Sequence, residues 1–186
     1  MLGLMSEHDI DWFGRPGGEP VQLCAYSAEW EQRARDWIVV IKDALEACQA
    51  AIDHIGSTAV PGLIAKPVID LLVAVPDVAD EPSYRAGFES LGLVLRAREP
   101  DHRFFRPPAR EPRLVHVHVC QVGSSWQQDH LLFRDCLRTQ PGTAAAYARL
   151  KKDLTRSVGQ DRGRYNEGKT NFIHSVLAAA GRQPQG

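Results

Sequence analysis

An apolar run at residues 67–75 constrains the fold more than any other part of the sequence, and only Asp70 interrupts it. A strand that is apolar on both faces is typical of the buried centre of a sheet. A carboxylate in such a strand is costly to desolvate unless it is paired or binds a metal ion. Asp70 is therefore the first candidate functional residue. The alternative is a structural aspartate that pairs with Lys66 or an arginine.

The segment before this run predicts a strand at 51–55 that ends at Gly56 and Ser57. Glycine lets a phosphate group come close to the backbone. The free N–H groups of the turn and the Ser57 hydroxyl can then donate to that phosphate. A simpler interpretation is a turn at a strand end with a capping serine. We interpret His54 as a residue that braces this loop through a hydrogen bond.

The remaining elements predict a mixed α+β fold. Further strands are expected at 21–25, 93–98, 103–106 and 114–121. The first expected helix runs from a cap at Ser27 to about 49, and a second lies at 82–91. A third begins at a capping box formed by Ser124 and Gln127 and runs to about 138, where a break at 141–142 follows. Two more helices are expected at 144–156 and 165–180. Strands in the middle of the chain and helices at its end favour α+β over a Rossmann alternation. The expected architecture is a small mixed sheet flanked by helices, with a C-terminal helical section.

The composition is that of a globular domain. Of 186 residues, 44% are hydrophobic, and the formal net charge is −1. This charge argues against nucleic-acid binding, which needs many lysine and arginine contacts to phosphates. No apolar stretch is long enough to span a membrane, and the start lacks a signal-peptide pattern. The four cysteines lack CxxC spacing. We therefore expect a cytoplasmic protein with reduced cysteines. Prolines and glycines at 15–20 predict a flexible N-terminal arm over 1–20, followed by one domain at 21–180.

Two histidines alternate with valines in the strand expected at 114–121. Side chains two residues apart on a strand face the same side, so His116 and His118 share one face. If this strand lies beside the one that carries Asp70, either imidazole can complete a metal site or act as a general base. A donor set of one aspartate and two histidines suits Mn²⁺ or Zn²⁺ better than Mg²⁺. The alternative is a polar sheet face without a ligand.

A basic segment at 95–113 holds six arginines and three acids. Guanidinium groups suit phosphates and carboxylates. Arg103 and Arg106 flank two phenylalanines, so at least one of them is expected to face a cleft. The other interpretation is a solvated hairpin.

The string from His54 to Leu63, followed by Lys66, Pro67 and Asp70, resembles the GrpB family, a branch of the nucleotidyltransferase superfamily. The resemblance covers about 21–178. It is extended by Tyr26, Glu29, Trp30, the segments 116–119 and 130–135, Lys169, Phe172 and Ile173. It implies a nucleotidyltransferase-like fold in which two aspartates on one strand and a third carboxylate on a neighbouring strand hold metal ions. Asp70 matches the first aspartate, Leu72 stands in place of the second, and 114–121 holds no acid.

The resemblance implies a nucleotide-binding protein that uses a divalent metal (Mg²⁺ or Mn²⁺, with Zn²⁺ as a further choice) and a nucleoside triphosphate, with nucleotidyl transfer to a small acceptor as the reaction. The candidate phosphate-binding residues are Gly56, Ser57, Lys66, Arg103, Arg134 and Lys169. The alternatives are an inactive ligand-binding module of the same fold and a metal-dependent enzyme of another class. The expected partner is a small nucleotide or phosphorylated molecule. The sequence predicts neither the acceptor nor the oligomeric state.

Overall fold

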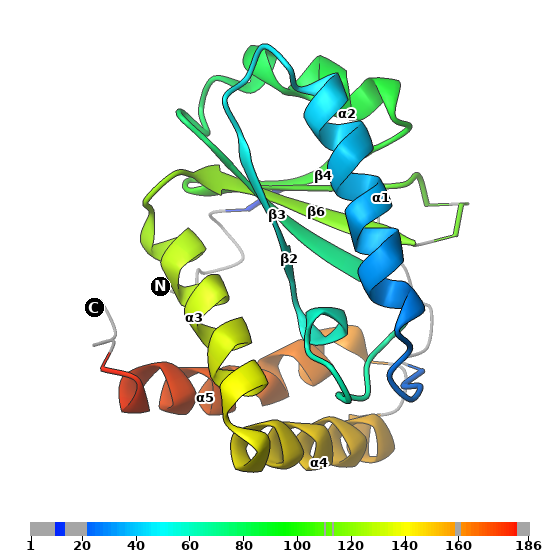
Figure 1. The fold of residues 1–186 in the computed structure, drawn as a ribbon, viewed down its shortest axis with the longest axis vertical. Helices are drawn as coiled ribbons and strands as arrows, with labels where there is room; N and C mark the ends of the chain where they lie inside the picture. The colour runs from blue at the N-terminus through cyan, green and yellow to red at the C-terminus, as the bar shows by residue number, and fades with distance from the viewer. Residues whose placement is uncertain (1–9, 14–21, 110, 113, 159–160, 182–186) are drawn as a thin grey trace.

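A computed structural model describes residues 10–13, 22–109, 111–112, 114–158 and 161–181. In these residues, six strands form one mixed sheet in the order β1-β4-β5-β6-β3-β2 (Figure 1). The strands are β1 Asp11–Trp12, β2 Ala51–Ile55, β3 Ile69–Val75, β4 Val94–Glu99, β5 His102–Arg106 and β6 Val115–Gln121. The central pair, β3 and β6, is parallel, and the other pairs are antiparallel.

Helices cover the two faces of this sheet. They are α1 Glu29–Ala44, α2 Arg85–Ser90, α3 Ser125–Thr139, α4 Pro141–Val158 and α5 Arg162–Ala179, with 3₁₀ turns η2 Ser57–Ala59 and η3 Glu81–Ser83. The main core packs α1 and α2 against one face, where Ile69, Leu71 and Val73 of β3 are fully buried. On the other face, α3 packs over Leu72, and α4 and α5 lie side by side near η2 (Figure 1). Both faces of β3 are therefore covered, which explains its nearly continuous apolar sequence.

The α+β architecture with a C-terminal helical section is confirmed. At the start of α3, Ser124 Oγ accepts from the Gln127 backbone N–H at 3.3 Å, as the capping-box spacing predicts. The break between the two helices falls at Gln140, and Pro141 begins α4, because proline is tolerated at the first helical position, where its missing N–H would have no partner. In the described part of the chain, no helix is long and apolar enough to cross a membrane.

Three boundaries near the N-terminus differ from the expectation. Within 22–25, only Cys24 forms a bridge, to Ala65, so the strand expected at 21–25 is reduced to one pair. The N-cap position of α1 is Ala28, but the Ser27 hydroxyl accepts from the Glu29 N–H at 3.3 Å; α1 ends at Ala44 rather than near 49. Most of the arm predicted at 1–20 lies outside the described residues, but Asp11–Trp12 pairs with β4. This part of the arm is therefore an edge strand of the sheet.

Candidate functional site

The parallel pairing of β3 and β6 brings Asp70 and the two histidines together. Asp70 is directly opposite His116, and strand alternation puts His118 on the same face. His116 Nδ1 lies 3.0 Å and His118 Nε2 4.0 Å from Asp70 Oδ1. One ligand atom from each residue falls within 4.8 Å of the other two. The adjacency that the sequence left open is thus present, and we call Asp70, His116 and His118 the triad.

The chemistry of the triad fits a divalent transition metal. A carboxylate oxygen and two imidazole nitrogens are ligands that Zn²⁺ and Mn²⁺ accept, whereas Mg²⁺ prefers oxygen ligands alone. His116 Nε2 is buried and has no hydrogen-bond partner among the described residues. Burial lowers the pKa of His118 well below its usual value, so its imidazole is neutral, the form that binds metals. The three side chains could hold one ion with small adjustments.

The expected place of a second aspartate is apolar. Leu72 is fully buried and packs with Ile55, Ala74 and Cys120, and Trp126 of α3 packs against this cluster. A carboxylate here would be removed from water within this apolar cluster. The triad therefore differs from the two-aspartate arrangement that the superfamily resemblance implies.

Gly56 fixes the Asp70 carboxylate from the side of β2. Its φ of 71° lies in the left-handed region, which favours glycine. A Cβ atom at this position would stand 2.4 Å from Asp70 Oδ2. The glycine is therefore required by the backbone conformation and by close contact with the triad.

Replacing Gly56 with alanine is expected to displace the Asp70 carboxylate. The positive φ should lower the free energy of unfolding by about 1–2 kcal/mol, which urea denaturation measures. Gly62→Ala is the matched control, because Gly62 has a φ of 76° but nothing within 4 Å of an added Cβ. Both variants should lose stability from the positive φ, Gly56→Ala should lose more because of its clash with Asp70, and only Gly56→Ala should weaken any metal binding measured by titration calorimetry. Equal metal affinity in the two variants would contradict the proposed contact.

Three lysines extend from the Gly56-Ser57 turn, where Lys151 lies, to Tyr165 of α5, where Lys66 and Lys169 lie. Lys151 is 2% exposed, and its ammonium donates to Ser57 Oγ at 2.9 Å and to the Ile64 carbonyl and lies 4.8 Å from the Tyr147 ring centre. Lys66 and Lys169 each place their ammonium 4.6 Å from the ring centre of Tyr165. We call Lys66, Lys151 and Lys169 the lysine cluster.

The electrostatics of the lysine cluster favour an anionic ligand. Burial, and next the charge of Lys169, lower the pKa of Lys151 to about 7. Burial also lowers the pKa of Lys169 to about 8, against the opposing effect of Asp70. Both shifts mean that the charged ammonium groups are under-solvated where they stand. A bound phosphate would relieve this cost by supplying negative charge and acceptors.

Lys151 was not among the residues predicted from sequence. A signal was present, because Tyr147, Lys151 and Leu154 follow one another at helical spacing on α4. A lysine on an apolar stripe is buried or partnered more often than one on a polar face. His102 and His130 were also missed. Their closeness to His118 depends on strand pairing and on the packing of α3, which leave no local pattern.

The two predicted arginines are engaged elsewhere. Arg103 pairs with Val119, so it lies on the sheet face opposite the triad, where its Nε is 2.6 Å from Glu81 Oε1. Arg134 donates to Asp53 Oδ1 at 3.0 Å and also pairs with Asp135 at 2.8 Å. The structure therefore brings Gly56, Ser57 and Lys169 to the triad, whereas Lys66 lies beside Tyr165. Arg103 is on the opposite face, and Arg134 is paired with Asp53 and Asp135.

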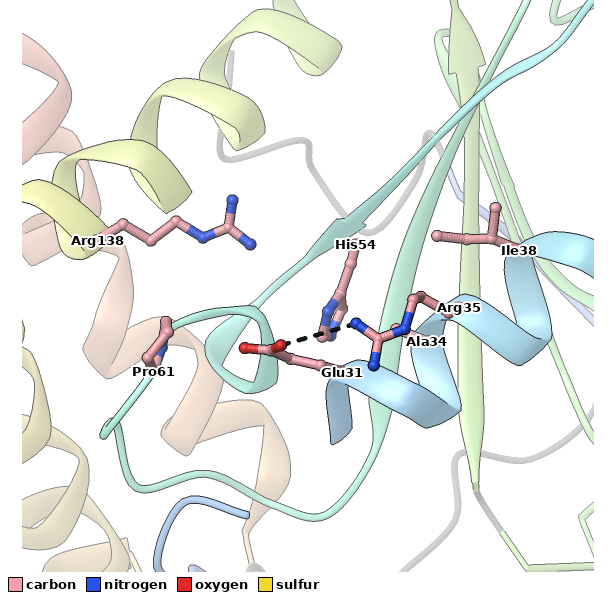
Figure 2. A pocket seen from close by; sticks show the side chains of 7 residues that line it. All are labelled: Glu31, Ala34, Arg35, Ile38, His54, Pro61 and Arg138. Carbon is pink, nitrogen blue, oxygen red and sulfur yellow. Dashed lines mark ion pairs between the residues drawn. The ribbon is translucent and has the colours of Figure 1, made fainter. Parts of the chain in front are cut away.

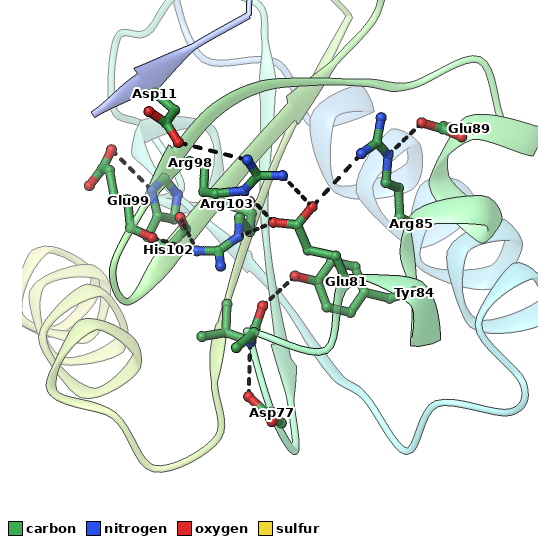
Figure 3. A network of polar contacts seen from close by, with 12 residues as sticks. Asp11, Asp77, Glu81, Tyr84, Arg85, Glu89, Arg98, Glu99, His102 and Arg103 are labelled. Atoms are coloured by element: carbon green, nitrogen blue, oxygen red, sulfur yellow. Dashed lines mark hydrogen bonds and ion pairs between the residues drawn. The ribbon is translucent and has the colours of Figure 1, made fainter. Parts of the chain in front are cut away.

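A buried acidic residue organises the arginines of the basic segment. Glu81 accepts from Arg98 at 2.6 and 2.8 Å and from Arg103 at 2.6 Å (Figure 3). The hydrogen bonds from Arg98 are the largest cause that lowers the pKa of Glu81 to about 2. Arg98 also lies 3.7 Å from Asp11 of β1. Arg98 and Arg103 therefore form a structural network rather than a solvated hairpin.

A concavity separate from the triad lies on the α1 side of β2. It has a volume of about 470 Å³, and its lining residues are Glu31, Ala34, Arg35, Ile38, His54, Pro61 and Arg138 (Figure 2). His54 Nε2 is 3.0 Å from Thr58 Oγ1, and this hydroxyl donates to the Val68 carbonyl at 3.2 Å. Burial lowers the pKa of His54 to about 4. The structure thus agrees with a loop-bracing role for His54, between β2, η2 and the start of β3.

Comparisons with known proteins identify the family. The family profile described as "GrpB protein" matches residues 20–179. A UPF0157 protein of Streptomyces coelicolor is 37% identical over 172 residues, which are 92% of this chain and 90% of that protein. A dephospho-CoA kinase of Mycobacterium leprae is 30% identical over 83% of this chain, but the match covers only 45% of the kinase. The crystal structure of GrpB from Enterococcus faecalis superposes with a TM-score of 0.74 and 30% identity, over 86% of this chain and 96% of that one. The chain therefore belongs to the GrpB family.

Proposed function

We propose that this protein binds a nucleoside triphosphate together with a divalent metal ion, and that it transfers the nucleotidyl group to a small acceptor. One observation carries the proposal: the triad and the lysine cluster meet at a single turn. Gly56 contacts the carboxylate of Asp70, and the next residue, Ser57, accepts a hydrogen bond from Lys151. A metal ligand set next to buried cations suits a ligand that combines phosphates with a bound metal.

The lysine cluster and the turn would bind the phosphates. The Ser57 hydroxyl and the ammonium groups of Lys151 and Lys169 supply donors, and Lys66 adds positive charge beside Tyr165. Burial lowers the pKa of Lys151 to about 7, and the negative charge of a bound phosphate should raise this pKa again, which keeps the ammonium protonated. These residues would orient the chain of phosphates and keep water from it.

The triad would hold the metal ion, whose chemistry is to polarise a phosphoryl oxygen. Asp70 supplies the negative charge, and His116 and His118 supply neutral nitrogens. In the alternative division of roles, one histidine binds the metal with Asp70 and the other acts as the general base for the acceptor hydroxyl. The likeness to the matching segment of a dephospho-CoA kinase agrees with a phosphorylated ligand.

A second candidate function is ligand binding without catalysis. Leu72 favours this candidate, because a buried leucine stands where the superfamily resemblance implies a metal-binding aspartate. Both functions require the triad and the lysine cluster. They differ in whether incubation with a nucleoside triphosphate and candidate acceptors releases pyrophosphate.

A thermal-shift panel tests the proposed binding. Wild-type protein should be stabilised by a nucleoside triphosphate with Mn²⁺, Zn²⁺ or Mg²⁺, by about 2.7 kcal/mol at 100 times the dissociation constant. For a chain of this size that is a rise in Tm of several degrees. Asp70→Asn, which keeps the shape but removes the charge, should abolish the metal-dependent part. A folded wild-type protein that responds to no nucleotide and no metal would overturn the proposal.

A lysine pair separates phosphate binding from metal binding. Lys151→Met should weaken nucleotide binding at least tenfold and leave the affinity for metal alone unchanged, as measured by titration calorimetry. Lys152→Met is the matched control, because Lys152 is exposed on the same helix. Equal nucleotide affinities in the two variants would exclude Lys151 from the site.

A further inference from the structure

His118 is held by more than its own strand. Its Nδ1 lies 3.0 Å from Nε2 of His102, which faces it from β5. The His102 ring is stacked on Trp126 with centroids 4.5 Å apart and planes 10° apart. The imidazole of His118 therefore has a hydrogen bond on the side opposite the Asp70 carboxylate, and its partner is fixed by an aromatic ring.

The hydrogen-bond chemistry of this pair determines where the protons are. A neutral imidazole has one N–H donor and one acceptor nitrogen. If His118 Nε2, which lies 4.0 Å from Asp70 Oδ1, is to bind a metal, its Nδ1 must carry the proton and donate to His102 Nε2. His102 must then carry its own proton on Nδ1.

The surroundings of His102 match that assignment. His102 is 6% exposed, and its Nδ1 is buried without a hydrogen bond among the described residues. Glu99 Oε1 lies 3.3 Å from this nitrogen, at an angle outside hydrogen-bond geometry, on a side chain that is 24% exposed. The carboxylate of Glu99 is therefore next to the one atom of His102 that needs an acceptor, and a small rotation of its side chain completes the contact.

We propose that His102 is a positioning residue of the triad, which fixes His118 in the Nδ1–H tautomer and aims its Nε2 at the metal, with Glu99 as the acceptor behind it. This inference rests on the proposed metal site, and it deepens it by adding outer residues from β4 and β5. Metal-binding histidines are commonly oriented in this way by a partner on the other nitrogen, and losing that partner typically lowers metal affinity 10–100-fold.

Two substitutions of His102 separate the hydrogen bond from packing. His102→Phe keeps a ring that can stack on Trp126 but removes the acceptor. His102→Gln places an amide oxygen near the position of Nε2 and keeps the acceptor. His130→Phe is the matched control, because His130 is also stacked on Trp126, at 3.5 Å, and bonds to the Trp126 carbonyl, not to His118.

Metal titration of the full chain gives the first result. Zn²⁺ affinity should fall 10–100-fold in His102→Phe, and it should stay within a few-fold of wild type in His102→Gln and His130→Phe. The visible absorption spectrum of the Co²⁺-loaded protein should change in His102→Phe alone, since its coordination is altered. Wild-type affinity and an unchanged Co²⁺ spectrum in a folded His102→Phe variant would overturn the positioning role and leave the metal site intact.

The tautomer of His118 gives a result that does not depend on metal. Long-range ¹⁵N–¹H correlation NMR of the metal-free wild type should show His118 as the Nδ1–H tautomer, and His102→Phe should shift it toward a mixture. An Nε2–H tautomer in wild type would overturn the inference. If wild-type protein binds no metal but shows the Nδ1–H tautomer, the proposed function fails while the orientation by His102 stands.

Discussion

Replacing Glu81 by glutamine should lower the free energy of unfolding by about 3 kcal/mol at pH 7, because the change leaves two guanidinium groups without their carboxylate. Glu81 receives two hydrogen bonds from Arg98 and one from Arg103, whose side chain is only 7% exposed. Breaking a buried ion pair on one side is more costly than never forming it, since the remaining charge stays desolvated. Urea denaturation of both proteins measures the difference.

The pH dependence of stability provides a second readout of the same contact. The pKa of Glu81 is about 2 in the folded protein and 4.5 as its ordinary value. Because the folded pKa is depressed, the stabilisation is present above about pH 4.5 and is lost as the pH falls toward 2. Glu81→Gln should remove much of this pH dependence. The control Glu89→Gln should change the stability little, because Glu89, which pairs with Arg85, is 47% exposed. Parallel pH profiles for wild type and Glu81→Gln would contradict the assignment.

Leu72→Asp introduces the aspartate that the superfamily resemblance implies. We expect this substitution to destabilise the protein rather than to activate it. Leu72 is fully buried, and Trp126 packs against its cluster. The change removes buried apolar volume, which alone costs about 2–5 kcal/mol, and adds an unpaired polar group. We expect a total loss of about 4–5 kcal/mol in the free energy of unfolding.

The pH profile distinguishes a buried carboxylate from a simple cavity in this variant. Burial raises the pKa of an aspartate, so the loss in Leu72→Asp should grow as the pH rises above about 4. Leu72→Ala should lose stability without that pH dependence, and Leu72→Met should lose less than about 1.5 kcal/mol. Thermal denaturation between pH 4 and 8 compares the three. A Leu72→Asp protein as stable as wild type, with increased Mg²⁺ affinity, would show that the site accepts a second carboxylate.

Local patterns in the sequence predicted the parts of the site that depend on one strand. The apolar run marked β3 and its single acid, Asp70, and the alternation of histidine with valine put His116 and His118 on one face. Contact between these strands could not be derived locally, because pairing of β3 with β6 joins residues that are 46 positions apart. Strand pairing at such separations is decided by the whole sheet.

The arginines show a second limit of local patterns. Alternation along β5 required Arg103 and His102 to face opposite sides, but it did not say which side holds the triad. Arg103 was interpreted as a phosphate ligand because its carboxylate partner, Glu81, is 22 residues away in the sequence and was not recognised. Lys151 was overlooked for the converse reason: its place is set by how α4 packs on the turn at Ser57.

The chain order of the site has a consequence for its biogenesis. The triad lies between residues 70 and 118, whereas Lys151 and Lys169 come from the last two helices. A ribosome makes these parts in sequence, at roughly 5–20 residues per second, so the sheet emerges several seconds before the final lysine. The nascent protein thus completes the triad first and adds Lys151 and Lys169 last. The proposed ligand site is therefore complete only when the C-terminal helices have been translated.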